Sequence, residues 1–250
     1  MPRYTIIRAT VFLLLTSACG QPTRSAEPAS IALPADDHRI LAYTVDPTAV
    51  DLRFYWNDET DERYASLGKL QRAVSARGDS LLFAVNGGMY DKERAPQGLY
   101  VEDGRTLMPI DTAREGYGNF YLQPNGVFAL RDDGRPLIVR TTEYATEGVR
   151  YATQSGPLLV TGGELHPAFN EGSANVHYRN GVGVLPDGRL LFATSTEKIN
   201  FFDFATYFRR KGCRDALYLD GYVSRTWWPA GGVRQRDGDF GVIIGVSAPK

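Results

Sequence analysis

Four short motifs place polar side chains beside glycine at points where apolar runs end. They lie at residues 86–91, 154–157, 179–183 and 219–225. Glycine allows the chain to turn sharply and lets a ligand approach the backbone closely, and loops held on a rigid sheet commonly carry binding groups. A single Asn-Gly or Asp-Gly pair is also an ordinary turn signal. The motifs therefore indicate a functional site as a set rather than one by one.

Asp220 is the strongest candidate for a reactive group. It directly follows the apolar run at residues 216–219, so it comes at the end of a strand that looks buried. An ionised carboxylate in such a place needs partners to offset its desolvation. Arg179 and Arg225 are the candidate partners, because both arginines lie in the same set of motifs.

The rest of the chain predicts a β-rich fold that would hold these motifs at strand ends. Three tight-turn pairs, Asp103-Gly104, Asp133-Gly134 and Asp187-Gly188, join neighbouring apolar or alternating runs and predict hairpins. Strand-like runs occur at residues 39–45, 51–56, 81–86, 98–102, 126–131, 137–142, 157–160, 183–185, 190–194, 216–219 and 241–246.

Two segments have the spacing of helices. Residues 64–76 repeat apolar side chains at helical spacing and end before Gly78. Residues 200–211 gather phenylalanines on one side, with Asn200 as the expected N-cap and Gly212 as the expected left-handed end. Each helix precedes a strand-like run that ends in one of the polar motifs. We therefore predict an α+β fold with a mixed, mostly antiparallel central sheet, many hairpins and a few packed helices.

The N-terminus has the pattern of an export signal. Positive residues precede a short apolar stretch at residues 9–15, which is too short to span a bilayer, and small residues lead to Cys19. The pattern fits signal-peptidase cleavage, and it also resembles a bacterial lipobox in which Cys19 becomes the lipidated first residue. The N-terminal pattern has three interpretations: a signal that leads to lipidation of Cys19, a signal for plain secretion, or a buried first helix.

The expected division of the chain follows from this pattern. We expect a signal peptide over residues 1–19, a flexible tether rich in Pro, Ser and Ala over residues 20–35, and a single domain over residues 36–250. The expected location is the periplasm or cell envelope, with membrane contact only through a lipid on Cys19.

Composition and charge exclude some functions. The formal net charge is −1 at pH 7, which leaves no broad basic face for nucleic acid. The three histidines have no metal-ligand spacing and no nucleotide-binding glycine motif is present, so we expect neither a metal nor a cofactor. Cys213 has no partner in the chain if Cys19 is lipidated or removed, and it is expected to be a small buried residue rather than a nucleophile.

Taken in order, the four motifs resemble the pattern of the phosphodiester glycosidase domain family. That pattern is an Asn-Gly-Gly-Met/Phe-Tyr/Phe segment, a Ser/Gly-Gly-Pro segment, an Arg-x-x-x-Gly strand and a Leu-Asp-Gly segment with a nearby Ser. Here these segments lie at residues 86–90, 155–158, 179–183 and 219–224, and the resemblance covers about residues 81–246. It implies an exported hydrolase that cleaves a sugar from a phosphodiester at the anomeric carbon of the sugar.

The resemblance also implies roles for individual residues. Asp220 would act as nucleophile, base or electrostatic group beside an oxocarbenium-like transition state. Arg179, with Arg225 as second choice, would bind the phosphodiester through its guanidinium. Asn86 and Ser155 would orient sugar hydroxyls or phosphate oxygens. The other expected substrate-binding residues are Gly87, Gly88, Tyr90, Asp91, Gln154, Gly156, Asn180, Thr194, Gly221, Ser224 and Arg225.

Two other functions stay open. A non-catalytic glycan-binding protein of the cell envelope could use the same scaffold, because a fold does not guarantee chemistry, and Tyr222 stands where many family members have a second glycine. An amidase or transpeptidase that uses Cys213 would need a histidine nearby, and no motif places one there.

Overall fold

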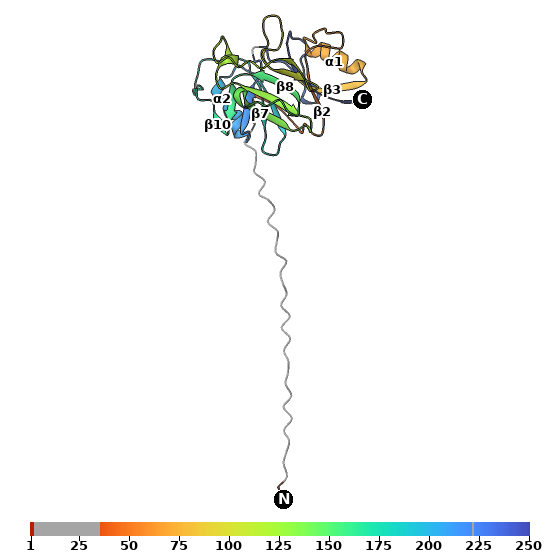
Figure 1. The fold of residues 1–250 in the computed structure, drawn as a ribbon. Coiled ribbons are helices and arrows are strands. Elements are labelled where there is room, and N and C mark those ends of the chain that lie inside the picture. Colours follow the sequence, from red (N-terminus) through yellow and green to blue (C-terminus); the bar gives the residue numbers. More distant parts are fainter. Residues whose placement is uncertain (3–35, 222) are drawn as a thin grey trace. The chain divides into compact units, whose positions relative to one another are not determined.

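The strands of the described residues pair into three antiparallel sheets, and Figure 1 shows the fold as a ribbon. The computed structural model describes residues 1–2, 36–221 and 223–250, so the predicted signal peptide, tether and lipidated Cys19 fall outside the described residues, as does Tyr222. The first sheet has the order β1 (Ile40–Val45), β12 (Leu190–Ser195), β11 (Asn180–Val184), β13 (Asp215–Tyr218), β9 (Leu158–Thr161) and β10 (Glu164–Leu165).

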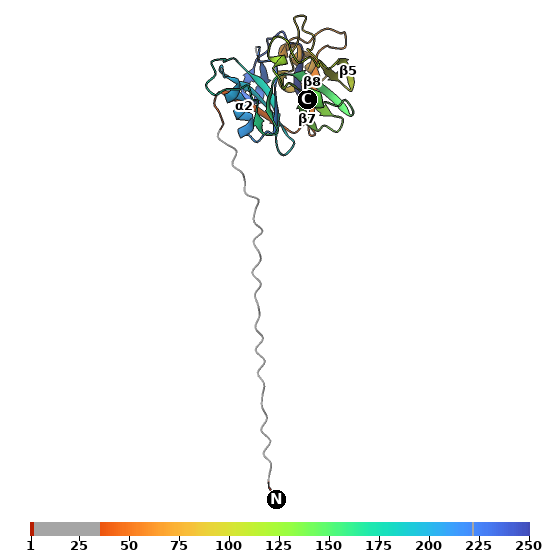
Figure 2. The same cartoon turned by 60° about the vertical axis from the view of Figure 1, so that its left-hand side comes forward.

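The other two sheets have five strands each. The second runs β15 (Val233–Arg234), β14 (Thr226–Trp228), β3 (Asp79–Asn86), β16 (Ile243–Pro249) and β2 (Asp51–Tyr55). The third runs β5 (Arg105–Met108), β4 (Tyr100–Glu102), β8 (Val149–Ser155), β6 (Gly126–Arg131) and β7 (Pro136–Arg140). In Figure 2 the third sheet, marked by β5, β7 and β8, lies on the side away from α2 (Phe201–Arg210).

The main hydrophobic core joins the three sheets. Phe54 and Phe83 come from the second sheet, Phe128 from the third and Phe192 from the first, and each is at most 2% exposed. The ring centroids of Phe54 and Phe128 lie 5.2 Å apart, and those of Phe83 and Phe192 lie 5.3 Å apart. Offset and tilted aromatic pairs at this separation are favourable beyond the area they bury, so the core fixes the sheets against one another.

Two α-helices cover the outer faces of different sheets, on opposite sides of the molecule in Figure 1. Helix α1 (Leu67–Ala76) packs on the second sheet, and the Ser66 hydroxyl caps it by accepting from the Lys69 amide at 3.2 Å. Helix α2 packs on the first sheet, and the Asn200 side chain accepts from the Asp203 amide at 2.8 Å. Both predicted helices and the Asn200 cap are confirmed. Among the described residues, three short 3-10 turns add to the helices, at Asn119–Tyr121, Thr141–Glu143 and Pro229–Gly231.

The predicted fold class is confirmed, with one difference in arrangement. The described strands are divided among three sheets instead of being gathered in one central sheet, and every recorded pairing is antiparallel. The three predicted turn pairs each connect the strands of a hairpin, β4 to β5, β6 to β7 and β11 to β12. The strands that the sequence did not predict are β5, β8, β10, β14 and β15. None of the helices among the described residues has the length and hydrophobicity that a membrane span requires.

The polarity of the strands brings the third and fourth motifs together. Strand β11 begins at Asn180 and runs antiparallel to its neighbours, so Asn180 pairs with Thr194 near the end of β12, and Gly181 pairs with Tyr218 at the end of β13. The amide of Leu219 donates to the Asn180 carbonyl at 2.9 Å, which continues this contact past the end of β13. The strand ends that carry polar residues therefore meet at a common edge.

Candidate active site

Asn86 ties three of the four motifs together. Its side-chain amide nitrogen donates to the Asp220 carbonyl, and its side-chain oxygen accepts from the Arg225 amide at 2.9 Å. Its main-chain carbonyl accepts from the Asn180 side chain at 2.6 Å. The residue is completely buried. Its hydrogen-bonding groups are thus used by the protein, and they fix the loop that carries Asp220.

The Asp220 carboxylate lies beside two tyrosine hydroxyls. Burial, the negative charge of Asp220 and a hydrogen bond to its side chain together raise the pKa of Tyr90. Burial also raises the pKa of Tyr218 to about 12, with the Asp220 charge acting in the same direction and the Arg179 cation opposing it. Both hydroxyls are therefore protonated donors at neutral pH. The Asp220 carboxylate accepts from the Tyr90 hydroxyl and lies within the electrostatic range of Tyr218, whose hydroxyl bonds Arg179.

Tyr218 belongs to the site although no motif includes it. Its hydroxyl also approaches the main chain of the next motif, because a Cβ atom on Gly221 would lie 1.8 Å from that oxygen. This close approach requires glycine at position 221. A sequence signal for Tyr218 exists, since side chains two residues apart on a strand share a face, and Tyr218 and Asp220 have that spacing.

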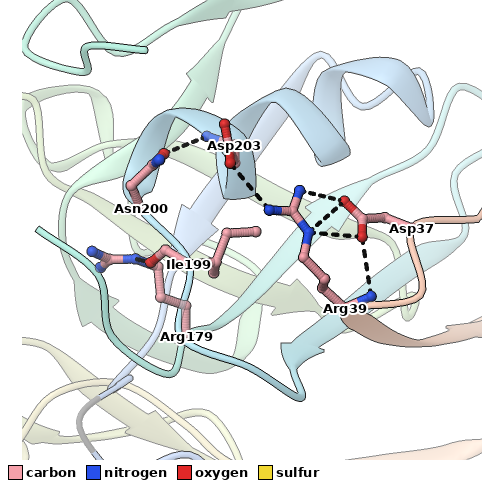
Figure 3. Close-up of polar contacts among 6 residues, drawn as sticks. All are labelled: Asp37, Arg39, Arg179, Ile199, Asn200 and Asp203. Carbon is pink, nitrogen blue, oxygen red and sulfur yellow. Dashed lines mark hydrogen bonds and ion pairs between the residues drawn. The ribbon is translucent and has the colours of Figure 1, made fainter. Parts of the chain in front are cut away.

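Arg179 is completely buried, and its guanidinium is held by the protein. Figure 3 shows its Nε donating to the Ile199 carbonyl, at 2.8 Å. An amino group of the fork donates to the main-chain carbonyl of Asn175 at 2.9 Å and to the side-chain oxygen of the same residue at 3.2 Å. The guanidinium carbon lies 3.5 Å from the centroid of the Phe201 ring, a stacked cation–π contact.

No carboxylate in the described part of the chain forms an ion pair with Arg179. Burial lowers the pKa of this guanidinium, and the neighbouring Tyr218 hydroxyl acts in the opposite direction. The nearby Arg39 differs, because Figure 3 shows it between two carboxylates: it lies 2.7 Å from Asp37 and 3.2 Å from Asp203 of α2. A buried cation without an anionic partner is unfavourable for stability alone, so Arg179 marks a place suited to an external anion.

Three buried polar side-chain atoms near these groups have no hydrogen-bond partner among the described residues. They are the hydroxyls of Thr153 and Ser155 at the end of β8 and the side-chain oxygen of Asn180. A Cβ atom on Gly88 would lie 2.1 Å from the Thr153 hydroxyl and 2.7 Å from the Gln154 carbonyl, so the end of β8 packs directly on the first motif. Unpaired buried polar atoms are rare in folded proteins. Here they are unsatisfied within the described part of the chain.

Other predicted site residues are occupied by the protein. The Gln154 side chain accepts from the amides of Leu99 and Asp111, and it donates to the Asp111 carbonyl and the Thr141 hydroxyl. The Gly87 amide donates to the Val242 carbonyl at 2.8 Å. A Cβ atom on Gly156 would lie 2.7 Å from the Phe120 carbonyl. These groups shape the loops, and the Gly87 amide is already bonded within the protein.

Two of the predicted charged groups have partners within the protein. Asp91 is exposed, and its side chain accepts from the Ala95 amide at 2.9 Å within a turn. The Arg225 guanidinium is paired with Asp237 at 2.8 Å. Arg225, Ser224 and Thr194 line a separate hollow next to the Asp220 loop.

Neither the cysteine nor the histidines form a reactive cluster. Cys213 is 2% exposed, as predicted, and burial raises the pKa of its thiol to about 12. Burial lowers the pKa of His166, whose Nδ1 accepts from the Ala168 amide at 3.1 Å. Among the described residues, no group of three or more His, Cys, Asp or Glu side chains is arranged to hold a metal ion.

The sequence profile of the phosphodiester glycosidase family matches residues 79–243, a stretch that contains all four motifs. The chain belongs to this family. It is also 34% identical over 209 residues to YigE, an uncharacterized protein of Escherichia coli (strain K12), and the match covers 83% of this chain and 81% of YigE.

Two solved structures have a fold similar to that of this phosphodiester glycosidase family member. One is the catalytic domain of zebrafish N-acetylglucosamine-1-phosphodiester alpha-N-acetylglucosaminidase, auto-inhibited by its pro-peptide, with a TM-score of 0.57 and 13% identity over 86% of this chain and 85% of that one. The other is a Burkholderia pseudomallei K96243 protein whose name proposes that it is exported, with a TM-score of 0.56 and 13% identity over 83% and 73%. At these identities the likeness is one of fold.

Proposed function

We propose that this protein is a hydrolase that removes a sugar from a glycosyl phosphodiester. The observation that carries the proposal is the buried Arg179 guanidinium, which has no carboxylate partner in the described chain and lies beside the Tyr218 hydroxyl, where the charge of Asp220 is also felt. Membership of the phosphodiester glycosidase family supports the same substrate class, as does the fold shared with the zebrafish enzyme.

Asp220 would act at the anomeric carbon. The bond between this carbon and the phosphate oxygen breaks, and its electron pair leaves with the phosphate monoester. Water supplies the oxygen that the anomeric carbon gains, and its proton goes to solvent or to the phosphate. The carboxylate stabilises the positive charge that develops on the sugar ring. The hydroxyl of Tyr90, which is hydrogen-bonded to the carboxylate, would hold it in position.

Arg179 would act on the phosphate side through its charge and through Tyr218. Its fork already donates to the Ile199 carbonyl and to Asn175, so the bidentate phosphate contact expected from the sequence is replaced by a fixed buried cation. Charges inside a protein interact more strongly than charges in water, and prepositioned charge is an effective way to stabilise a leaving group. Asn86 would be a positioning residue, because it holds the Asp220 loop.

The unpaired polar atoms supply the sugar contacts of the proposal. The Ser155 hydroxyl and the Asn180 side-chain oxygen, both without a partner in the described chain, would bind sugar hydroxyls. No separate general acid is invoked, because a phosphate monoester has a second pKa of about 6 and leaves without much proton donation.

Sugar release from a panel of glycosyl phosphodiesters tests the proposal. Free sugar is measured by mass spectrometry for the full chain, for Asp220→Asn and for the control Asp133→Asn, which alters an exposed hairpin carboxylate paired with Arg135. Asp220→Asn should lower the rate by roughly 10²- to 10⁴-fold, and the control should retain the full rate. Full activity of Asp220→Asn would contradict the assigned role, and an intact glycan bound without turnover would favour the non-catalytic alternative.

Export is a second part of the proposal. It rests on the signal pattern before Cys19 and on the related Burkholderia fold. The proposed lipoprotein-type export signal covers residues 1–19, with Cys19 lipidated and kept as the first residue of the mature chain; the tether covers residues 20–35 and the domain residues 36–250. Metabolic labelling with a radioactive fatty acid should label the wild-type chain and leave Cys19→Ala unlabelled, and equal labelling of both would exclude lipidation at this residue.

A further inference from the structure

A polar hollow of about 580 Å³ lies beside the Asp220 loop, and none of the residues that line it has a role in the proposed hydrolysis step. Its walls come from the starts of β1 and β11, from the end of β12, from the residues that lead into β14, and from β15 and the residues that follow it. The hydroxyl- and amide-bearing residues that line it include Thr194, Thr196, Ser224 and Gln235. Its volume is in the range of small-molecule binding sites, so a ligand of the size of one or two sugar rings can enter.

The hollow has one cation and one anion in its lining, and they neutralise each other. Arg225 Nε donates to the Asp237 carboxylate at 2.8 Å, and both side chains remain partly exposed, at 32% and 63%. A second Arg225 donor contacts the Ser224 carbonyl at 3.0 Å. Since no other charged residue lines the hollow, an anionic ligand gains little there. The Arg225–Asp237 pair instead offers donors and acceptors side by side, which suits vicinal hydroxyls.

The remaining lining supports the same ligand class. Tyr178 is 48% exposed and contributes an aromatic face at the edge of the hollow, and a half-exposed ring can cover the apolar face of a sugar. The Gln235 side-chain oxygen accepts from the Thr226 amide at 2.8 Å. Its amide nitrogen has no bond within the described chain and remains available as a donor.

The hollow shares its walls with the elements that fix the proposed catalytic groups. The Ser224 hydroxyl donates to the Gly221 carbonyl at 2.8 Å, and the Arg225 amide donates to Asn86. The Ser195 hydroxyl, which also lines the hollow, accepts from the Arg179 amide at 2.8 Å. A ligand in the hollow would therefore contact the same loop that carries Asp220.

We propose that this hollow is a binding site for a neutral saccharide or polyol, held by Arg225, Asp237 and Gln235 against Tyr178. That this saccharide is part of the phosphodiester substrate rests on the proposed function. The site itself does not.

Direct binding tests the hollow without any turnover. The probes are maltose, cellobiose, chitobiose and glycerol, with inorganic phosphate as the anionic comparison, titrated into the isotope-labelled full chain and followed by amide and side-chain NMR. At least one neutral disaccharide should shift the signals of Arg225, Gln235 and Asp237. Asp237→Asn and Gln235→Ala should each weaken its affinity by tenfold or more. Asp187→Asn, which alters an exposed carboxylate paired with Arg189 at 2.7 Å, should leave the affinity unchanged.

Three outcomes would overturn the inference: no neutral probe binds, phosphate alone shifts these signals, or the variants at Asp237 and Gln235 bind as well as the wild type. Sugar release by the same proteins separates this inference from the proposed function. Saccharide binding in the hollow without hydrolysis would leave the inference standing and count against the hydrolase. Hydrolysis that is insensitive to Asp237→Asn and Gln235→Ala, together with no probe binding, would overturn the inference and leave the proposed hydrolase standing.

Discussion

Replacing Arg179 by lysine keeps the buried positive charge and removes most of the contacts of the guanidinium. The variant therefore separates the effect of the charge from the effect of the hydrogen bonds and the ring contact. The guanidinium makes three hydrogen bonds, to the Ile199 carbonyl and to two oxygens of Asn175, and it stacks on Phe201. A single ammonium group cannot reach both acceptor residues in the same geometry, and it lacks a planar face to stack.

The expected loss of stability follows from these contacts. We take two of the three hydrogen bonds as lost, because the ammonium can reach only one of the two acceptor residues. Each lost bond contributes about 1 to 1.5 kcal/mol, and the lost desolvated cation–π contact contributes about 1 to 2 kcal/mol. The sum is about 3 to 5 kcal/mol, which leaves the domain folded at 25 °C if its stability is typical. A protein of this size loses about 2 to 4 °C in melting temperature per kcal/mol, so Arg179→Lys should melt roughly 6 to 20 °C lower than the wild type.

Urea unfolding at 25 °C and thermal unfolding, both followed by circular dichroism, measure this loss. The matched control is Arg135→Lys, because Arg135 is 74% exposed and pairs with Asp133 in a hairpin. That change should alter stability by less than about 0.5 kcal/mol. If Arg179→Lys unfolds like the wild type while sugar release falls by orders of magnitude, the guanidinium fork serves the substrate and our account of its contacts is refuted.

Three further predictions concern neighbouring groups. Gly221→Ala should lower the melting temperature because its Cβ would lie 1.8 Å from the Tyr218 hydroxyl, and adding Tyr218→Phe should restore part of the loss; an unchanged melting temperature would refute the steric argument. In a Cys19→Ser chain, Cys213 should resist a thiol reagent at pH 8 until the protein is denatured, because burial raises its pKa to about 12, and rapid reaction of the native protein would contradict this. Burial lowers the pKa of His166, so the folded state binds its proton less readily than the unfolded chain and the stability it contributes is lost as pH falls below about 6.5. The decline in unfolding free energy from pH 7.5 to 5 should be smaller in His166→Gln but unchanged in the exposed control His38→Gln, and identical declines in wild type and His166→Gln would exclude this cause.

Much of the fold could be predicted because its signals are local. The Asn200 cap, the left-handed Gly212 and the turn at Asp187-Gly188 each depend on a few neighbouring residues, and all three are confirmed. The division into three sheets could not be predicted in this way. It depends on which strands pair across long stretches of sequence, such as β1 with β12.

The candidate site was predicted in part for the same reason. The motifs identified Asp220 and Asn86, whose positions follow from short sequence patterns. The burial of Arg179 depends on the Ile199 carbonyl, 20 residues away in the sequence, and on an aromatic ring of the next helix. Tyr218 was missed because it reads as part of an apolar strand, although its spacing of two residues from Asp220 places both on one face.

Arg39 and Arg179 differ in their partners, and this difference is the physical reason to expect an anion-binding site at Arg179. Arg39 lies between Asp37 and Asp203, and it joins the start of β1 to the first turn of α2. Arg179 is buried more deeply, yet the described protein surrounds it with carbonyls, a phenolic hydroxyl and a ring instead of a carboxylate. Desolvation of an unpaired cation opposes folding, and an anionic substrate would supply the missing charge at that position. The same cation that lowers stability in the free protein would then favour binding of a phosphodiester.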